Sequence, residues 1–134
     1  MSLHALLQYI RYRLKAKTRH GIHSPFVYAF IEQGLMKMKG DVVAGTTSYF
    51  SGWTVSEFDI NSFDEIESAI SIAGERTVFI IKNIHNTSQA TMNWDALKTN
   101  NKVVIDIDLY STGLFFFNKD IKEKQSFVLK YPYK

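Results

Sequence analysis

The chain has 134 residues, of which 46% are hydrophobic, 14% aromatic and 22% charged, enough for a single domain with one hydrophobic core. It contains no cysteine, which excludes disulfides, thiolate metal sites and a cysteine nucleophile, and fits a cytoplasmic protein. No apolar run approaches the ~18 residues needed to cross a bilayer, so we expect no membrane partner.

The net charge of +3 is unevenly distributed. Residues 1–39 carry seven Lys and Arg against one acid, whereas the rest of the chain carries nine against twelve acids. We therefore divide the single domain into a basic helical head, residues 1–36, and a mildly acidic body, residues 41–134. This asymmetry predicts either a polyanion-binding face or a head that docks on its own body.

Two helices are predicted in the head. Residues 2–17 carry apolar side chains at helical spacing. These are Leu3, Leu6, Leu7, Ile10 and Leu14. Gly21 interrupts this pattern, and Ser24 followed by Pro25 is typical of a helix N-cap and first helical position. A second helix is therefore expected over residues 25–36. The side chains that it should bury are Phe26, Phe30 and Ile31.

The body is predicted to alternate strands and helices. Residues 41–53, punctuated by glycines, are interpreted as one strand and a turn, and we expect 41–50 to pair along a sheet edge. Residues 54–60 alternate with period two, and residues 77–84 form an apolar run typical of a strand covered on both faces. Helices should begin at Ser62 and Thr87.

The carboxyl-terminal part is predicted to be antiparallel. The segments K-V-V-I-D-I-D-L and G-L-F-F-F-N-K flank Y-S-T, which indicates a hairpin from residue 102 onward, and residues 126–131 should form a last strand. The fold class is therefore α/β, with a mixed sheet and helices on both faces.

The glycines exclude two nucleotide sites. No two of the seven glycines are spaced as G-x-G, and no Gly-Lys-Ser/Thr follows a predicted strand. A standard Rossmann or P-loop phosphate site is therefore not expected.

A histidine pair, His20 and His23, precedes the second predicted helix. Two imidazoles without a nearby carboxylate make an incomplete zinc site. We therefore expect their ring N–H groups to donate hydrogen bonds to open backbone carbonyls at the helix junction.

Carboxylates and a histidine follow the predicted strands. Asp106 and Asp108 project to one face of a strand, and we interpret them as the solvated face of a half-exposed sheet rather than as paired catalytic acids. Asp59 and His85 are each expected at the carboxyl end of a parallel strand, where open α/β sheets bind ligands. One acid and one histidine make no catalytic triad, so no catalytic residue and no metal ligand is assigned.

A basic run in the head is the candidate polyanion face. Its cations are Arg11, Arg13, Lys15, Lys17 and Arg19. Nucleic acid is the less favoured partner, because no recognition motif accompanies the charge.

Two segments carry a family resemblance. Residues 9–32 contain R-H-G-I-H-S-P-F and resemble the opening of a bacterial subgroup of class I S-adenosylmethionine-dependent methyltransferases, in which R-H-G-x-H-S-P-F is characteristic. Residues 77–131 resemble the end of the same proteins, with a strand leading to Ile-His, a helix with a tryptophan, and a hairpin with Gly-Leu-x-Phe-Phe. The match covers about 80 of the 134 residues.

The middle of the chain departs from this family. The family carries its cofactor site there, on a strand, a loop of the type E-x-G-x-x-x-G and a second strand ending in an acid. Only about 40 residues separate the matched ends here, and they contain no such loop. Lys82 and Asn83 stand where the family has acidic or acid-amide residues, and an ammonium there would repel a divalent cation.

The resemblance implies a truncated Rossmann-like methyltransferase sheet, of parallel strands followed by an antiparallel carboxyl-terminal hairpin, with two amino-terminal helices. We expect no cofactor, although intact relatives bind S-adenosylmethionine. We also expect the protein to be catalytically inactive and to act as a binding or interaction protein. The alternatives are a nucleic-acid-binding module and an active methyltransferase with an unusual cofactor site. The candidate remnant pocket comprises His20, His23, Asp59, Lys82, Asn83 and His85.

The shortened sheet also predicts a homodimer, because it leaves an edge that another chain can pair with. Tyr49, Phe50 and Trp53 are the expected anchors of that contact. The alternative is that these aromatic side chains fold back and fill the gap.

Overall fold

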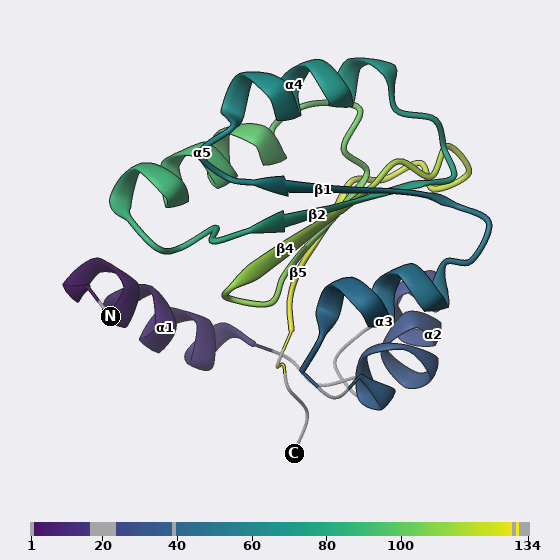
Figure 1. Ribbon diagram of the computed structural model, residues 1–134. Coiled ribbons are helices and arrows are strands. Elements are labelled where there is room, and N and C mark those ends of the chain that lie inside the picture. Colours follow the sequence, from purple (N-terminus) through teal and green to yellow (C-terminus); the bar gives the residue numbers. More distant parts are fainter. Residues whose placement is uncertain (1, 17–23, 39, 130, 132–134) are drawn as a thin grey trace.

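A computed structural model describes residues 2–16, 24–38, 40–129 and 131 of the chain (Figure 1). It is an α/β fold in which a mixed, five-stranded open sheet has the order β1-β2-β4-β3-β5. The strands are β1 (Thr54–Asp59), β2 (Thr77–Lys82), β3 (Ile105–Asp108), β4 (Thr112–Phe116) and β5 (Gln125–Val128). The α-helices are α1 (Leu3–Lys15), α2 (Pro25–Gln33), α3 (Val42–Tyr49), α4 (Phe63–Ile72) and α5 (Ser88–Lys98), and a 3-10 turn, Leu35–Lys37, follows α2.

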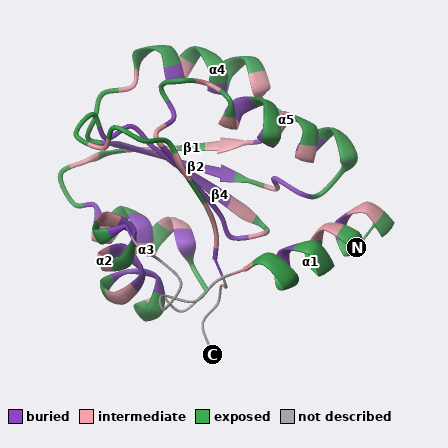
Figure 2. Ribbon diagram, turned by 180° about the vertical axis from the view of Figure 1, so that it is seen from behind, coloured by how far each residue is buried: buried purple, intermediate pink, exposed green. Residues whose placement is uncertain are grey.

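Helices cover both faces of the sheet, as the sequence predicted. Helices α2 and α3 lie on one face and α4 and α5 on the other, so the sheet is sandwiched between them (Figure 1). The buried hydrophobic residues follow the same division and form one apolar cluster on each face. Figure 2 shows the buried segments, in purple, in the sheet and in the helices on both sides of it. Within the described ranges, no helix combines the length and the apolarity that a bilayer-spanning segment needs.

The parallel pairing of the first two strands is confirmed. Strand β1 pairs with β2 in parallel, with Thr54 opposite Thr77 and Asp59 opposite Lys82. Five of the six residues of β2 are buried, which agrees with its apolar sequence. The predicted hairpin is confirmed as well, because β3 and β4 are antiparallel neighbours and Leu109 donates its N–H to the carbonyl of Thr112.

The last strand differs from the expectation. Strand β5 pairs with β3 in parallel, with Ile105 opposite Gln125, so the carboxyl-terminal part of the sheet is not antiparallel throughout. Strand β4 ends at Phe116 and β5 begins at Gln125, both opposite Ile105, so the connecting segment only passes from one side of β3 to the other at the same end of the sheet. As a result, β1, β2, β3 and β5 all end at the same edge, which we call the carboxyl edge.

Residues 41–50 were wrongly predicted to be an edge strand, because residues 42–49 form α3. Asp41 caps the helix by accepting a hydrogen bond from the N–H of Ala44, 3.0 Å away. Val42 and Thr46 are buried one turn apart, which is helical rather than strand spacing. A Cβ at Gly45 would lie 2.2 Å from the side chain of Met38, so this glycine serves close packing and not a turn.

The aromatic residues of this region fill the core. Phe50 is buried, and Tyr49 and Trp53 pack against it with ring centroids 4.8 Å away in both cases. Phe26, from α2, stacks on the same cluster. Tyr49, Phe50 and Trp53 therefore fold back on the sheet, as the alternative expected, and their role as anchors of a dimer contact stays a prediction.

Helix α2 begins as the sequence predicted. Pro25 is its first residue, and the Ser24 hydroxyl accepts a hydrogen bond from the N–H of Val27, 3.4 Å away. Phe30 and Ile31 are fully buried and Phe26 is half-buried. The histidine pair, His20 and His23, and the cations Lys17 and Arg19 lie outside the described residues.

Candidate functional site

The carboxyl edge carries the polar side chains that the sequence singled out. Asp59 is the last residue of β1, Lys82 is the last of β2, and Asp108 is the last of β3. Helix α1 crosses part of this edge, below α5 and the β3–β4 turn (Figure 1). It is held by contacts with residues that follow β2, β3 and β5, so two separate polar regions result, one beneath α1 and one beside Lys82.

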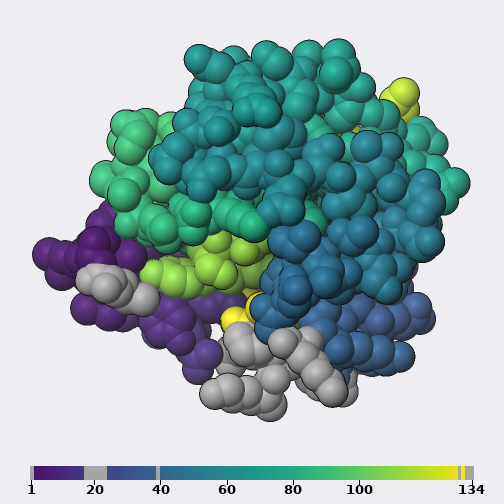
Figure 3. Space-filling view, viewed as in Figure 1, coloured from purple at the N-terminus to yellow at the C-terminus, as the bar shows by residue number. Residues whose placement is uncertain are grey.

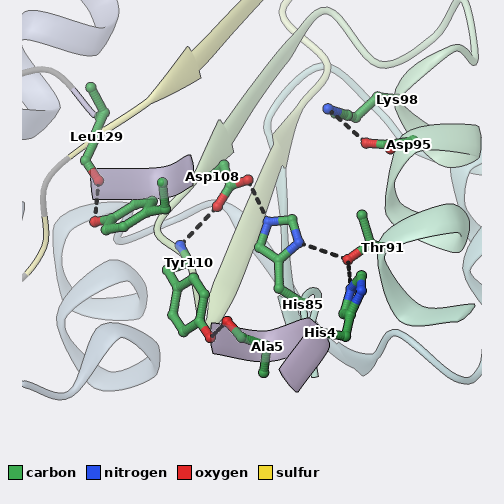
Figure 4. A network of polar contacts seen from close by, with 10 residues as sticks. His4, Ala5, His85, Thr91, Asp95, Lys98, Asp108, Tyr110 and Leu129 are labelled. Carbon is green, nitrogen blue, oxygen red and sulfur yellow. Dashed lines mark hydrogen bonds and ion pairs between the residues drawn. The ribbon is translucent and has the colours of Figure 1, made fainter. Parts of the chain in front are cut away.

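The region beneath α1 is centred on a hydrogen bond between His85 and Asp108 (Figure 4). His85 Nε2 lies 2.6 Å from Asp108 Oδ2, and both side chains are largely buried. The other oxygen of the carboxylate, Oδ1, accepts a hydrogen bond from the N–H of Tyr110 at 2.8 Å. The Tyr110 ring stacks on the imidazole, with centroids 5.8 Å apart. The hydrogen-bonded pair of His85 and Asp108 is therefore held by a strand end, a turn and the loop before α5.

Thr91 joins this hydrogen-bonded pair to α1. Its Oγ1 lies 3.0 Å from His85 Nδ1 and 2.9 Å from His4 Nε2. A carboxylate only accepts hydrogen bonds, so His85 carries a proton on Nε2. In the neutral ring Nδ1 then accepts from the Thr91 hydroxyl, whose oxygen accepts from His4. The chain His4–Thr91–His85–Asp108 is thus satisfied internally, and its first effect is to attach α1 to the body.

Two tyrosine hydroxyls hold the remainder of α1. The Tyr12 hydroxyl donates to the carbonyl of Leu129 and accepts from the N–H of Tyr131 at 2.8 Å. Burial raises the pKa of Tyr12 to about 12. The Tyr110 hydroxyl donates to the carbonyl of Ala5, and burial raises the pKa of this tyrosine as well. These contacts keep one side of α1 against the carboxyl edge.

A cavity of about 200 Å³ lies between α1 and α5, and we call it the α1 pocket. Its cations are Arg11 and Lys15 from α1 and Lys98 from α5. Lys98 Nζ lies 3.2 Å from Asp95, whereas Arg11 and Lys15 form no ion pair with any other described residue. Asp108 and His85 form part of the wall. Two unpaired cations in a pocket with a hydroxyl and an imidazole suit an anionic ligand better than a cationic one.

The second region holds three members of the candidate remnant pocket. Asn83 Nδ2 donates to Asp59 Oδ2 at 2.7 Å, and the N–H of Asn61 donates to Asp59 Oδ1 at 2.9 Å. Both hydrogen bonds lower the pKa of Asp59, and the one from Asn61 has the larger effect. Asn83 has a φ of 64°, a left-handed conformation that asparagine tolerates better than most residues.

Lys82 lies beside this pair and forms an exposed ion pair with Glu57, whose hydrogen bond raises the pKa of Lys82. A cavity of about 360 Å³, the Lys82 pocket, extends from Lys82 and Asn83 to Asp41 and Tyr131. Among the described residues, no three histidine or acidic side chains come close enough to hold a metal ion. An ammonium in the wall makes the Lys82 pocket a poor site for a divalent cation.

The structure divides the candidate remnant pocket. Lys82 and Asn83 line the Lys82 pocket, and Asp59 is hydrogen-bonded to Asn83 beside it. His85 instead lines the α1 pocket and pairs with Asp108 and not with Asp59. Of the candidate polyanion face, Arg11, Arg13 and Lys15 are exposed on α1.

The interpretation of the paired carboxylates was wrong. Asp106 and Asp108 are 2% and 9% exposed, so they do not form a solvated sheet face. Strand β5 pairs with β3 along its open edge, and Asp106 accepts a hydrogen bond from Ser126 of β5 at 2.7 Å. Burial raises the pKa of Asp106. The sequence suggested that only the apolar side chains of β3 are buried, but all four residues of the strand are buried.

Sequence reasoning missed the partners of His85. It assigned no role to Thr91, His4 or Tyr110. Each of these residues makes at least one of its contacts in this region with a residue that is distant in the sequence. The usable signal was the pair of strand ends: His85 follows β2 and Asp108 ends β3, and strands that are parallel bring such residues to one edge.

No protein-family model, no curated protein and no solved structure matches this chain.

Proposed function

We propose that the chain is a methyltransferase-like protein that does not bind S-adenosylmethionine and that acts as a binding or interaction protein. The proposal rests on the sequence resemblance at both ends of the chain. It is supported by the order of the elements, since two parallel strands with intervening helices precede an antiparallel hairpin. The signature segment also ends at a helix start, where Ser24 and Pro25 open α2.

One observation carries the loss of the cofactor. In the described residues, no glycine lies between the end of β1 and the start of α4, or between the end of β2 and the start of α5. The adenosyl and methionine parts of S-adenosylmethionine must approach the backbone closely at such a turn, and glycine permits that approach. Asp59, the acid at the end of β1, is already bonded to Asn61 and Asn83.

Calorimetric titration of S-adenosylmethionine and of S-adenosylhomocysteine into the purified protein tests this proposal. We expect no heat of binding at ligand concentrations up to the millimolar range, while circular dichroism shows a folded α/β protein. A micromolar dissociation constant for either ligand would contradict the proposal. It would support the alternative of an active methyltransferase with an unusual cofactor site.

The second candidate function is the binding of polyanions by the head. Its specific support is that Arg11 and Lys15 are exposed and form no ion pair with another described residue. This function predicts that a labelled oligonucleotide binds less tightly as salt increases. The double variant Arg11→Gln/Lys15→Gln should lower the slope of log K against log salt by about 2. The matched variant Lys119→Gln/Lys122→Gln, which removes two exposed lysines before β5, should leave the slope unchanged.

We also propose self-association through β1, the edge strand of the sheet. Thr54 and Ile60 donate their N–H groups to the carbonyls of Arg76 and Lys82, on the side of β2. The N–H groups of the alternate residues Val55, Glu57 and Asp59 therefore point to the open side of β1. A second chain can pair with such an edge. Light scattering after size exclusion tests this: we expect twice the monomer mass of 15.4 kDa, and a monomer at tens of micromolar protein would contradict the proposal.

A further inference from the structure

The outward face of α1 is an apolar stripe. Leu3, Leu7, Ile10 and Leu14 recur every three or four residues, so they lie on one side of the helix. Their exposed fractions are 73%, 50%, 48% and 82%, and Leu6, which is 46% exposed, widens the stripe. Aliphatic side chains of this size are normally buried, and five of them on three turns of one helix form a contiguous apolar surface.

The body of the protein does not cover this stripe, because the opposite side of α1 is already attached to it. Ala5 and Tyr12 are the buried residues of the helix. Tyr12 bonds to Leu129 and Tyr131, and His4 bonds to Thr91. Rotating the leucines inward would break these hydrogen bonds. In Figure 3, the segment from residue 3 to 15 lies at the margin of the molecule, where one side of it faces outward.

Cations flank the stripe on both sides. At 3.6 residues per turn, Arg11 and Lys15 lie roughly 70–110° to one side of it and Arg13 roughly 90° to the other. All three are exposed, and none forms an ion pair with a described residue. Helix α1 contains no acidic residue. Arg11 and Lys15 also line the α1 pocket, so a cavity with cationic walls lies next to the apolar surface.

The charges around the stripe identify its occupant. A second copy of the chain would bring the same cations, with no acid on its α1 to pair with them. The roughly 500 Å² of apolar surface in the stripe is comparable to the apolar share of a standard dimer interface, so area does not distinguish the two occupants. A membrane with anionic headgroups accepts leucines at the acyl boundary and places phosphates where the flanking cations lie.

We propose that α1 is an interfacial helix that docks the protein on anionic phospholipid membranes. This proposal departs from the expectation of no membrane partner, because that expectation considered only segments that span a bilayer. The stripe of Leu3, Leu7, Ile10 and Leu14 enters the boundary between headgroups and acyl chains. Arg11, Arg13 and Lys15 contact lipid phosphates, and the α1 pocket accommodates a headgroup beside Lys98. The sheet and the other helices stay above the membrane, because α1 is held to them along its opposite side. This inference does not depend on the proposed loss of cofactor binding.

Vesicle co-sedimentation tests the apolar part of the proposal. The wild-type protein should sediment with vesicles of mixed phosphatidylglycerol and phosphatidylcholine and much less with phosphatidylcholine alone. The variant Leu7→Ser/Leu14→Ser should partition about tenfold more weakly or worse, because two apolar side chains leave the stripe. The matched variant Ile72→Ser/Met92→Ser, at positions 85% and 61% exposed on α4 and α5, should bind like wild type.

Two further measurements separate this surface from other binding modes. Arg11→Gln/Lys15→Gln should weaken binding to the anionic vesicles and reduce its salt dependence, whereas Lys119→Gln/Lys122→Gln should not. A tryptophan introduced as Ile10→Trp should shift its emission to the blue on addition of anionic vesicles, as its indole leaves water. Nucleic-acid binding, by contrast, should respond to the arginine and lysine variant but not to Leu7→Ser/Leu14→Ser.

Three results would overturn the proposal. Folded wild-type protein that ignores anionic vesicles is the first. Equal vesicle binding by the stripe variant and by the Ile72→Ser/Met92→Ser control is the second, because it would show that the stripe is not the contact. The third is a dimer in light scattering that Leu7→Ser/Leu14→Ser converts to a monomer in the absence of lipid, which would make the stripe a self-association surface.

Discussion

Helices α1 and α2 lie in the same basic head, and both have apolar residues at helical spacing. Their apolar sides nevertheless face in opposite directions relative to the core. In α2 the apolar side is turned inward, and Val27, Phe30 and Ile31 are fully buried against the sheet. In α1 the apolar side is turned outward, and the helix is held by the hydroxyls of Tyr12 and Tyr110 and by His4. Apolar spacing therefore indicates a helix and its apolar side, but not what covers that side.

The difference has consequences for stability. Helix α2 depends on buried apolar area, which contributes through the whole range of pH and salt. Helix α1 depends on a few directional polar contacts, which are lost when one group changes its protonation or loses its partner. The predictions below test this contrast, beginning with the largest expected effect.

The substitution Phe30→Ala should lower the free energy of unfolding by about 3–5 kcal/mol, because it leaves a cavity among Tyr49, Phe50 and Phe116. Urea denaturation followed by circular dichroism measures the change. Tyr28→Ala is the matched control, since Tyr28 is exposed on the same helix and its loss should cost less than about 1 kcal/mol. Equal losses for the two variants would show that α2 is not held by burial.

Alkaline pH should loosen α1. Burial raises the pKa of Tyr12 to about 12 from an ordinary value near 10, so the fold favours the protonated hydroxyl. This contribution is complete below pH 10 and is lost as the pH rises through about 12. Allowing for screening by solvent, we expect a loss of about 1–2 kcal/mol from Tyr12.

Denaturation at pH 9 and at pH 12 measures this loss, and Tyr12→Phe isolates the contribution of Tyr12 from those of other tyrosines. Burial also raises the pKa of Tyr110 and Tyr131, so part of the alkaline loss should remain in the variant. The difference in stability between wild type and Tyr12→Phe should shrink at the higher pH. A constant difference across this interval would mean that Tyr12 does not titrate there.

The substitution Thr91→Val should lower stability by about 1 kcal/mol, because it keeps the shape of the side chain and removes the hydroxyl between His4 and His85. Hydrogen exchange should show faster exchange in the first turns of α1 and no change in α2. Thr47→Val serves as the control, because the exposed hydroxyl of Thr47 bonds only to the carbonyl of Val43 in its own helix. Unchanged exchange in α1 would mean that the His4 contact does not attach the helix.

The smallest expected effect belongs to the apolar stripe itself. Leu14→Ala should change the free energy of unfolding by less than about 0.5 kcal/mol, although the same type of substitution at a buried position costs 2–5 kcal/mol. Leu14 is 82% exposed, so little of its surface is removed from water on folding. A loss above about 2 kcal/mol, measured by urea denaturation, would show that the stripe is covered in solution.

Much of the fold was accessible from the sequence because its signals are local. The Ser24-Pro25 cap, the buried run of β2 and the Thr87 cap each depend on residues that lie close together in the chain. The assignment of 41–50 failed for a local reason too. Its glycines were interpreted as turn residues, whereas Gly45 accommodates the side chain of Met38 within a helix.

The site was less accessible. Asp59 and His85 were correctly expected at the carboxyl ends of parallel strands, but their partners come from elsewhere in the chain. Asp108 reaches His85 because β4 lies between β2 and β3 and brings both strand ends to one edge. The spacing of Asp106 and Asp108 on β3 could not show that β5 would cover that strand in parallel.

By itself, the sequence determined the kinds of elements, most of their positions, the absence of a glycine loop, and the concentration of positive charge in the head. These follow from properties of neighbouring residues: capping, side-chain periodicity, backbone freedom and charge. Only the tertiary structure decided that His85 pairs with Asp108, that both strand carboxylates are buried, and that the leucines of α1 face outward. These outcomes depend on which distant segments compete for the same surface. Tyr12 and His4 find hydrogen-bond partners at the carboxyl edge, and a helix that satisfies them there must turn its opposite, apolar side to the outside.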